Sequence, residues 1–291
     1  MRLPSSRTLL TTGAALLVLG LAASWLVGSL MMRATPADVP PPQAPARDLR
    51  LRAADGLGLA ATYWPGRSPR SPAILLLHGN GASRAAMAEN AAWLAAQGYS
   101  ALTLDLRGHG ESDRAPKSFG LAESRDAAAA IEWLRANGHA RVGVVGVSLG
   151  GASALLGDDG PVAADALVLQ AVYPDIRSAI HNRIAGLVGR PPALLLEPLL
   201  SFQARLRLGV APSRLSPIEA LPVFRGAVFM IGGGEDGHTP PAETRALFAS
   251  ARGQKHLWIA PGLDHRAVSD VRSEPYRRRL HAFFESSLGA P

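Results

Sequence analysis

The sequence predicts an α/β domain built on a mainly parallel, eight-stranded β-sheet flanked by helices. Short apolar runs typical of buried strands alternate with longer stretches of helical periodicity along most of the chain. Strands separated by single helices favour right-handed crossovers and hence parallel pairing. The chain has 291 residues, of which 47% are hydrophobic, so it can bury a sizeable core.

The strand-like apolar runs and the helical patterns locate the expected elements along the chain. Strand-like runs cover residues 48–53, 57–64, 73–78, 100–106, 141–147, 166–172, 227–231 and 256–259. Helical patterns cover residues 84–97, 121–137, 149–156, 241–251 and 274–288. A short Asp55-Gly56 turn joins the first two strands, so we expect these two strands to pair antiparallel.

Residues 173–221 interrupt the alternation of strands and helices. This segment is rich in Pro and Leu and includes the run PPALLL at residues 191–196. Its pattern is helical and contains no strand-like run. We therefore expect a small helical cap above the sheet.

A long apolar stretch lies near the N-terminus. Residues 9–32 carry no charge, and as a helix they would extend about 36 Å, enough for a tilted bilayer crossing. Arg2 and Arg7 precede the stretch and Arg33 follows it, so the positive-inside rule holds the N-terminus in the cytoplasm. We expect a membrane anchor at residues 1–33 and an extracytoplasmic domain after it.

A cleaved signal peptide is the alternative, and it would leave a secreted or periplasmic protein. The apolar stretch exceeds the roughly 7–15 residues of a signal h-region, and no clean A-x-A site follows it, which favours the anchor. Without cysteine, a lipoprotein signal is excluded. A Pro-rich linker is expected at residues 34–47, followed by one domain at residues 48–291.

Composition also excludes several kinds of chemistry. The chain has no cysteine, so it has neither a thiol nucleophile nor a cysteine-based metal site. The formal charge of +7 comes almost wholly from arginine, without basic runs interleaved with aromatics, and we expect no nucleic-acid partner. No ligand-spaced set of His and acidic residues lies on one element, so no metal is expected.

Ser148 is the strongest candidate for a nucleophile. It lies in Gly146-Val147-Ser148-Leu149-Gly150, directly after a predicted strand and before a predicted helix. A sharp strand-to-helix turn needs small flanking residues and exposes the serine hydroxyl at the helix N-terminus. The five-residue motif alone is weak, and its position between strand and helix is what favours a nucleophile over an ordinary turn serine.

A serine nucleophile needs a base, and the base needs an orienting acid, in the chain order Ser, Asp or Glu, His. Glu235 and Asp236 follow the strand at 227–231, and the spacing alone does not separate them. His265 follows the last strand and precedes the terminal helix, as the base should. Asp264 is expected to serve the local turn.

The other histidines fit the role of base less well. His281 falls in the terminal helix, His139 at the opposite edge of the sheet and His181 in the expected cap, so surface or structural roles are favoured for them. His238 is the other histidine near the acid loop.

Acyl transfer by a serine nucleophile also requires hydrogen-bond donors that point at the carbonyl oxygen of the substrate, which becomes negatively charged during the reaction. The loop His78-Gly79-Asn80-Gly81 follows the strand at 73–77. The backbone N–H groups of Asn80 and Leu149 are the expected oxyanion hole. We expect His78 to order the loop rather than to act as a second base.

Four segments together resemble the α/β-hydrolase superfamily, in particular its Bem46-like and serine-aminopeptidase-like esterase and lipase group. In chain order they are residues 75–81 (LLLHGNG), residues 104–112 (LDLRGHGES), residues 146–150 (GVSLG), and the acid and base loops at 234–236 (GED) and 262–265 (GLDH). The resemblance covers about residues 48–288.

The resemblance implies the α/β-hydrolase fold, no cofactor, and hydrolysis through an acyl-enzyme on Ser148 with Asp236 and His265. It favours Asp236 over Glu235 and implies that residues 105–112 are a scaffold loop. Residues 232–234 (GGG) stand where the family usually has His-Gly, so we expect Asp236 to be held more loosely.

The resemblance does not supply the substrate. The apolar cap and the membrane segment favour a small-molecule ester or a lipid-like acyl compound. An acyltransferase or a peptidase using the same three residues remains an alternative. A catalytically silent, membrane-tethered binding protein is a second alternative, because a fold does not dictate its function.

Overall fold

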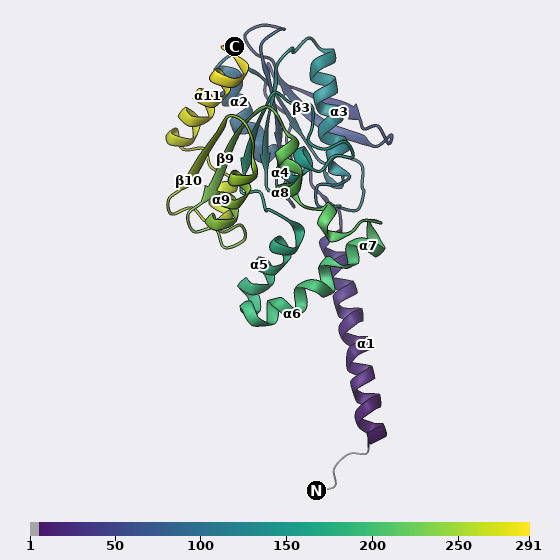
Figure 1. The fold of residues 1–291 in the computed structure, drawn as a ribbon. Helices are drawn as coiled ribbons and strands as arrows, with labels where there is room; N and C mark the ends of the chain where they lie inside the picture. Colours follow the sequence, from purple (N-terminus) through teal and green to yellow (C-terminus); the bar gives the residue numbers. More distant parts are fainter. Residues whose placement is uncertain (1–5) are drawn as a thin grey trace.

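The computed structural model describes residues 6–291, in which a central sheet carries helices on both faces (Figure 1). Of the basic residues expected before the apolar stretch, Arg2 lies outside the described residues, and of Arg7 only the backbone is described. The C-terminus lies at the end of the domain far from the N-terminal helix.

The central sheet has eight strands in the order β10-β9-β8-β7-β4-β5-β3-β2. β2 pairs antiparallel with β3, and β3 with β5, whereas all other neighbours are parallel. The predicted α/β fold with an antiparallel entrance is therefore confirmed. The strands are β2 (Arg47–Arg52), β3 (Gly58–Trp64), β4 (Ala73–Leu77), β5 (Ser100–Leu104), β7 (Val142–Val147), β8 (Ala166–Gln170), β9 (Ala227–Gly233) and β10 (Lys255–Ala260).

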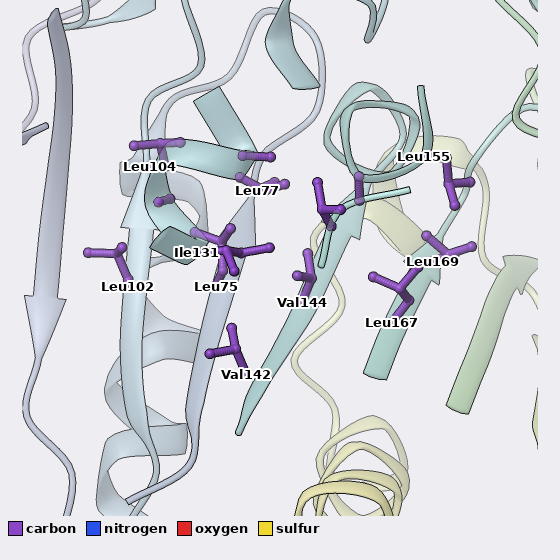
Figure 2. Close-up of a cluster of buried hydrophobic side chains, with 14 of the residues drawn as sticks. Leu75, Leu77, Leu102, Leu104, Ile131, Val142, Val144, Leu155, Leu167 and Leu169 are labelled. Atoms are coloured by element: carbon purple, nitrogen blue, oxygen red, sulfur yellow. The ribbon is translucent and has the colours of Figure 1, made fainter. Parts of the chain in front are cut away.

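Apolar side chains on the two faces of the sheet form two separate clusters. One face packs against helices α3, α4 and α9 through residues such as Ile131, Leu155 and Leu247, and Figure 2 shows part of this cluster. The other face packs against α2 and α11 through Leu94 and Phe284. These helices are α2 (Ala88–Ala96), α3 (Glu123–Ala136), α4 (Leu149–Leu155), α9 (Pro241–Ser250) and α11 (Glu274–Leu288).

Several short elements were not expected from the sequence. β1 (Thr35–Pro36) pairs in parallel with β6 (His109–Gly110), so the Pro-rich linker lies along the domain. The Val39 N–H also donates to the Glu111 carboxylate. Helix η1 (Arg84–Met87) lies within the helix predicted at residues 84–97. The other short helices are η2 (Pro212–Arg214), α8 (Pro217–Ala220), η3 (Leu221–Val223) and α10 (His265–Ser269).

Asp105 is the structural centre of the loop expected to be a scaffold. Its carboxylate is fully buried, forms an ion pair with the buried Arg84 guanidinium and accepts the Glu111 N–H. The Ser112 hydroxyl donates to the Asp105 carbonyl, and Arg107 pairs with Asp126. Buried charges are tolerated when they are paired in this way, so these residues hold the loop in place.

The first three helices of the segment at 173–221 lie at one end of the domain, where α6 contacts the N-terminal helix (Figure 1). They are α5 (Ile176–Val188), α6 (Arg190–Ser201) and α7 (Gln203–Arg207), and we call them the inserted helices. The N-terminal helix α1 (Ser6–Met31) extends away from the domain, and its residues Thr11–Met31 are long and apolar enough to cross a membrane.

Candidate active site

Ser148 is held at a strained turn between strand β7 and helix α4. Its φ of 47° and ψ of −107° lie in a region that residues other than glycine rarely adopt. Its backbone N–H donates to the Gln170 carbonyl over 2.8 Å, which ties the turn to the end of β8. Strained backbone of this kind concentrates at functional sites, because the surrounding structure must maintain it.

The two glycines of the motif are required by close backbone contacts. A Cβ atom on Gly146 would lie 2.5 Å from the Gly151 Cα, and one on Gly150 would lie 2.4 Å from the Leu77 carbonyl oxygen. Neither neighbour is a flexible side chain that could move away. The turn at Ser148 therefore depends on both positions, as the sequence motif predicts.

Two backbone N–H groups near Ser148 have no acceptor. Within residues 6–291, neither the N–H of Asn80 nor that of Leu149 makes a hydrogen bond. Both residues line the same small cavity as Ser148. Two N–H donors without an acceptor, in one cavity with a serine hydroxyl, are suited to bind an oxygen that becomes negatively charged.

Strands β9 and β10 are paired; Asp236 lies in the loop after β9, and His265 begins helix α10 after β10. The His265 Nδ1 and the Asp236 Oδ2 are 2.8 Å apart. The other carboxylate oxygen of Asp236 accepts the N–H groups of His238 and Thr239, each at 2.8 Å. Asp236 is thus buried and fixed by three hydrogen bonds, and the looseness expected from the Gly-rich segment before it is not seen.

The acidic and histidine residues that neighbour Asp236 and His265 in the sequence are placed differently from these two residues. Glu235 is exposed, and its side chain makes no hydrogen bond within the described part of the chain. Asp264 caps the N-terminus of α10 by accepting the Ala267 N–H, as expected of a turn residue. The His238 ring packs 4.9 Å from the His265 ring, and burial together with Arg183 and His265 lowers the pKa of His238.

Gln170 connects the Ser148 turn to the helix that begins with His265. Its backbone carbonyl accepts the Ser148 N–H, and its side-chain amide donates to the Val268 carbonyl in α10. No hydrogen bond joins Ser148 to His265 among residues 6–291. Contacts of this type are often long without substrate and tighten only in the complex.

Sequence patterns did not predict the rest of the cavity around Ser148. Its volume is about 50 Å³, and its remaining walls come from the end of α1, the loop before α3 and the start of the inserted helices. These wall residues are Met31, Phe119, Tyr173, Ile176, Ala179, Ile180 and Arg183. Gln170 was also missed, although a glutamine that ends a buried apolar strand is a usable signal.

His78 is buried beside this site in a neutral, structural arrangement, as expected of a loop-ordering residue. Its Nδ1 lies 2.8 Å from the Gly79 carbonyl, and its Nε2 accepts the Leu106 N–H. A proton on Nε2 would therefore point at the Leu106 N–H, so the neutral ring with an unprotonated Nε2 is favoured. Burial, helped by His109, lowers the pKa of His78 to about 3.

We expect His78 to make the fold less stable in acid. The unfolded chain takes up this proton near pH 6.5 and the folded chain only near pH 3, so the free energy of unfolding falls as pH drops through that window. The slope from this group approaches about 1.4 kcal/mol per pH unit. Urea unfolding at several pH values measures it, and His78→Gln should remove that part of the slope. An unchanged slope in the variant would contradict the assignment.

The described residues offer no obvious metal site. Among residues 6–291, no three His, Asp or Glu side chains converge in a way that could hold a metal ion. The ionisable side chains that line the Ser148 cavity are instead those of Tyr173 and Arg183.

Comparison with known proteins identifies the family of this chain. Residues 74–278 match the alpha/beta hydrolase family. The chain belongs to this family. The match extends from strand β4 into helix α11 and so includes the turn at Ser148 and the loops that carry Asp236 and His265.

Two bacterial relatives are also similar to this hydrolase-family chain. It is 26% identical over 193 residues to the protein YqkD of Bacillus subtilis, and the match spans 65% of this chain and 63% of that protein. It is 26% identical over 264 residues to YfhR of Salmonella typhimurium, with 86% of this chain and 85% of that protein covered.

Solved structures show the same fold. The esterase Pf2001 of Pyrococcus furiosus matches with a TM-score of 0.67 and 18% identity, over 88% of this chain and 99% of that one. The esterase EaEST of Exiguobacterium antarcticum matches with a TM-score of 0.59 and 18% identity, over 81% and 98% of the two chains. Family and fold together support a hydrolase.

Proposed function

We propose that this chain is a membrane-anchored serine hydrolase that cleaves ester-type substrates through an acyl-enzyme on Ser148. The observation that carries the proposal is the surroundings of the Ser148 hydroxyl. It lies at a strained strand-to-helix turn, in one cavity with the unpaired N–H groups of Asn80 and Leu149. A nucleophile beside two free donors is the arrangement that acyl transfer needs.

In the proposed mechanism His265 is the general base. Its Nε2 removes the Ser148 proton as the Oγ attacks the carbonyl carbon, and the carbonyl electrons move to the oxygen held by Asn80 and Leu149. The carbonyl reforms, the C–O bond to the alcohol breaks, and the imidazolium gives its proton to the leaving oxygen. Water then attacks the acyl-enzyme in the same way and releases the acid and free Ser148.

Asp236 would orient the imidazole during both halves of the reaction. Its contact with Nδ1 keeps the Nδ1 proton in place, so that Nε2 is free to accept the Ser148 proton. The carboxylate also stabilises the imidazolium that forms. The other oxygen of Asp236 accepts the N–H groups of His238 and Thr239, which hold the carboxylate in position for this role.

Helix α1 is proposed to stay on the mature protein as an anchor. The Ser24 hydroxyl donates to the Leu199 carbonyl, and Gln203 donates back to Ser24. Met31 also forms part of the wall of the Ser148 cavity. Cleavage after this helix would remove these contacts and open one side of the cavity, which favours retention over a signal peptide.

The proposed activity is tested with p-nitrophenyl esters of graded chain length and the purified full chain in detergent. We expect saturable release of p-nitrophenol that chelators do not affect. An amide substrate, p-nitroanilide, is the control for peptidase activity and should react more slowly. If the folded protein hydrolyses none of the esters, the esterase proposal is wrong and a binding role gains weight.

A further inference from the structure

Helix α6 has its apolar side outside and its polar side inside. Its buried residues are Ala193, Glu197 and Ser201, and the buried Glu197 carboxylate pairs with Arg177 of α5. Most large apolar side chains between residues 187 and 206 are exposed instead, with Leu195 exposed to 77% and Leu206 to 79%. We call this surface the apolar face, and it consists of Leu187, Val188, Leu194, Leu195, Leu196, Leu199, Phe202 and Leu206.

Exposed apolar side chains are ordinary when scattered, but contiguous groups of them mark contact surfaces. Eight of them lie within residues 187–206, from the end of α5 through α6 into α7, and form such a group. Two exposed arginines, Arg190 and Arg205, belong to the same segment. Arginines next to an apolar surface suit a lipid bilayer, because their long side chains can reach the phosphate groups.

Polar contacts fix the inserted helices against α1. Besides the hydrogen bonds at Ser24, the Arg207 guanidinium donates to the Trp25 carbonyl and the Ser29 hydroxyl. The same guanidinium stacks 3.7 Å from the centre of the Trp25 ring. Gly28 allows the close approach, because a Cβ atom there would collide with the Gln203 side chain.

These contacts set the depth of the inserted helices relative to α1. Residues Thr11–Met31 form the candidate membrane span, whose 21 residues extend about 31 Å, close to the thickness of a hydrocarbon core. Ser24 lies seven residues before Met31, about 10 Å along the helix axis. The Leu199 carbonyl accepts a hydrogen bond from Ser24. When α1 spans the bilayer, Leu199 therefore lies at the depth of the leaflet nearer to the catalytic domain.

The same seam between α1 and the inserted helices leads to Ser148. A second cavity, of about 30 Å³, is lined by Gly28, Leu200 and Ala204 where α1 meets α6 and α7. It shares wall residues with the Ser148 cavity, namely Met31, Phe119, Ile176 and Ile180. Both cavities are too small for an acyl ester, so the side chains that line them must move apart to admit one.

We propose that the inserted helices lie within the nearer leaflet of the bilayer crossed by α1, and that an amphiphilic acyl ester reaches Ser148 laterally from that leaflet along the α1 seam. The second half of this statement rests on the proposed ester hydrolysis. The first half, the insertion of the apolar face, does not depend on catalysis. The bilayer would cover the apolar face, and the shared cavity walls would take up the acyl chain.

Insertion is tested by measuring the depth of a label. The chain has no cysteine, so Leu195→Cys gives a single attachment site for an environment-sensitive fluorophore on the full chain. The labelled protein is placed in phosphatidylcholine–phosphatidylglycerol vesicles that contain lipids spin-labelled either at the middle of the acyl chain or at the headgroup. We expect stronger quenching by the acyl-chain label than by the headgroup label.

The matched control is Ala140→Cys with the same fluorophore. Ala140 is exposed and lies before β7, at the opposite end of that strand from Ser148. We expect neither spin label to quench it. Insertion would be overturned if the fluorophores at both positions were quenched equally and weakly. It would also be overturned if only the headgroup spin label quenched the fluorophore at Leu195→Cys. Neither result would bear on catalysis, which fluorophosphonate labelling tests separately.

Lateral access is tested by a ratio of activities. The triple variant Leu194→Ser, Leu195→Ser, Leu206→Ser alters exposed side chains only, so the fold should be preserved. We expect the ratio of activity on a long-chain ester in vesicles to activity on dissolved p-nitrophenyl butyrate to fall about tenfold or more. Val223→Ser, at another exposed apolar residue, should leave the ratio unchanged. An equal ratio in the triple variant and the wild type would contradict access from the leaflet.

Discussion

Ser148→Ala is expected to lower ester turnover about a millionfold, the loss seen when the nucleophile of a serine hydrolase is removed. Without the Oγ atom no acyl-enzyme can form, and the remaining rate comes from binding and from the free N–H groups at Asn80 and Leu149. The fold should tolerate the change, because alanine is smaller and the Ser148 hydroxyl has no hydrogen-bond partner among residues 6–291.

Ser83→Ala is the matched control for this variant. Ser83 lies in the loop that carries Asn80, and its hydroxyl does not cap the helix that follows. Loss of the same atom there should change turnover by less than about threefold. Initial rates on a short p-nitrophenyl ester, with circular dichroism to verify folding, measure both effects. Appreciable turnover by folded Ser148→Ala would remove Ser148 from the mechanism.

Asp236→Asn is expected to have the second largest effect, a fall in kcat of about 10⁴-fold. An amide cannot accept the Nδ1 proton of His265 and both backbone N–H groups as the carboxylate does. The imidazole would then adopt the wrong tautomer or the wrong orientation, and Nε2 could no longer take the Ser148 proton.

Glu235→Gln is the comparison that decides between the two adjacent acids. Glu235 is exposed and has no side-chain partner in the described chain, so its variant should keep nearly full activity. Kinetics of the two variants on the same ester give the answer. A larger loss in Glu235→Gln than in Asp236→Asn would exchange their roles.

The central sheet was predictable because its strands are continuous apolar runs between helical patterns. The predicted ends differ from the observed ones by a few residues; the run at 166–172, for example, ends as a strand at Gln170. The pairing of β1 with β6 and the short helix α10 were not predicted, because elements of two to five residues are too short to show a detectable periodicity.

A residue of the candidate site could be predicted where the backbone geometry around it requires particular neighbouring residues. Gly146 and Gly150 are fixed by contacts with backbone atoms, so the Ser148 turn has a recognisable sequence. Glu235 and Asp236 could not be separated by spacing, because only the fold decides which of them turns towards His265.

The packing of α1 on the inserted helices could not be predicted. Its apolar stretch indicated a membrane span but not which side of the helix meets a partner. Ser24, Gly28 and Ser29 interrupt that stretch on the side that contacts α6 and α7, and in retrospect they are the signal. The lining of the Ser148 cavity by Met31 follows from this tertiary contact alone.

Labelling of the full chain with a fluorophosphonate, followed by peptide mass spectrometry, tests directly whether Ser148 is the nucleophile. We expect one adduct, on the peptide that contains Ser148. The adduct should be absent from Ser148→Ala and strongly reduced in His265→Ala, because the hydroxyl needs its base to attack phosphorus. A folded wild-type protein that stays unlabelled, or that carries the adduct on another residue, would contradict the assignment of Ser148 as the nucleophile.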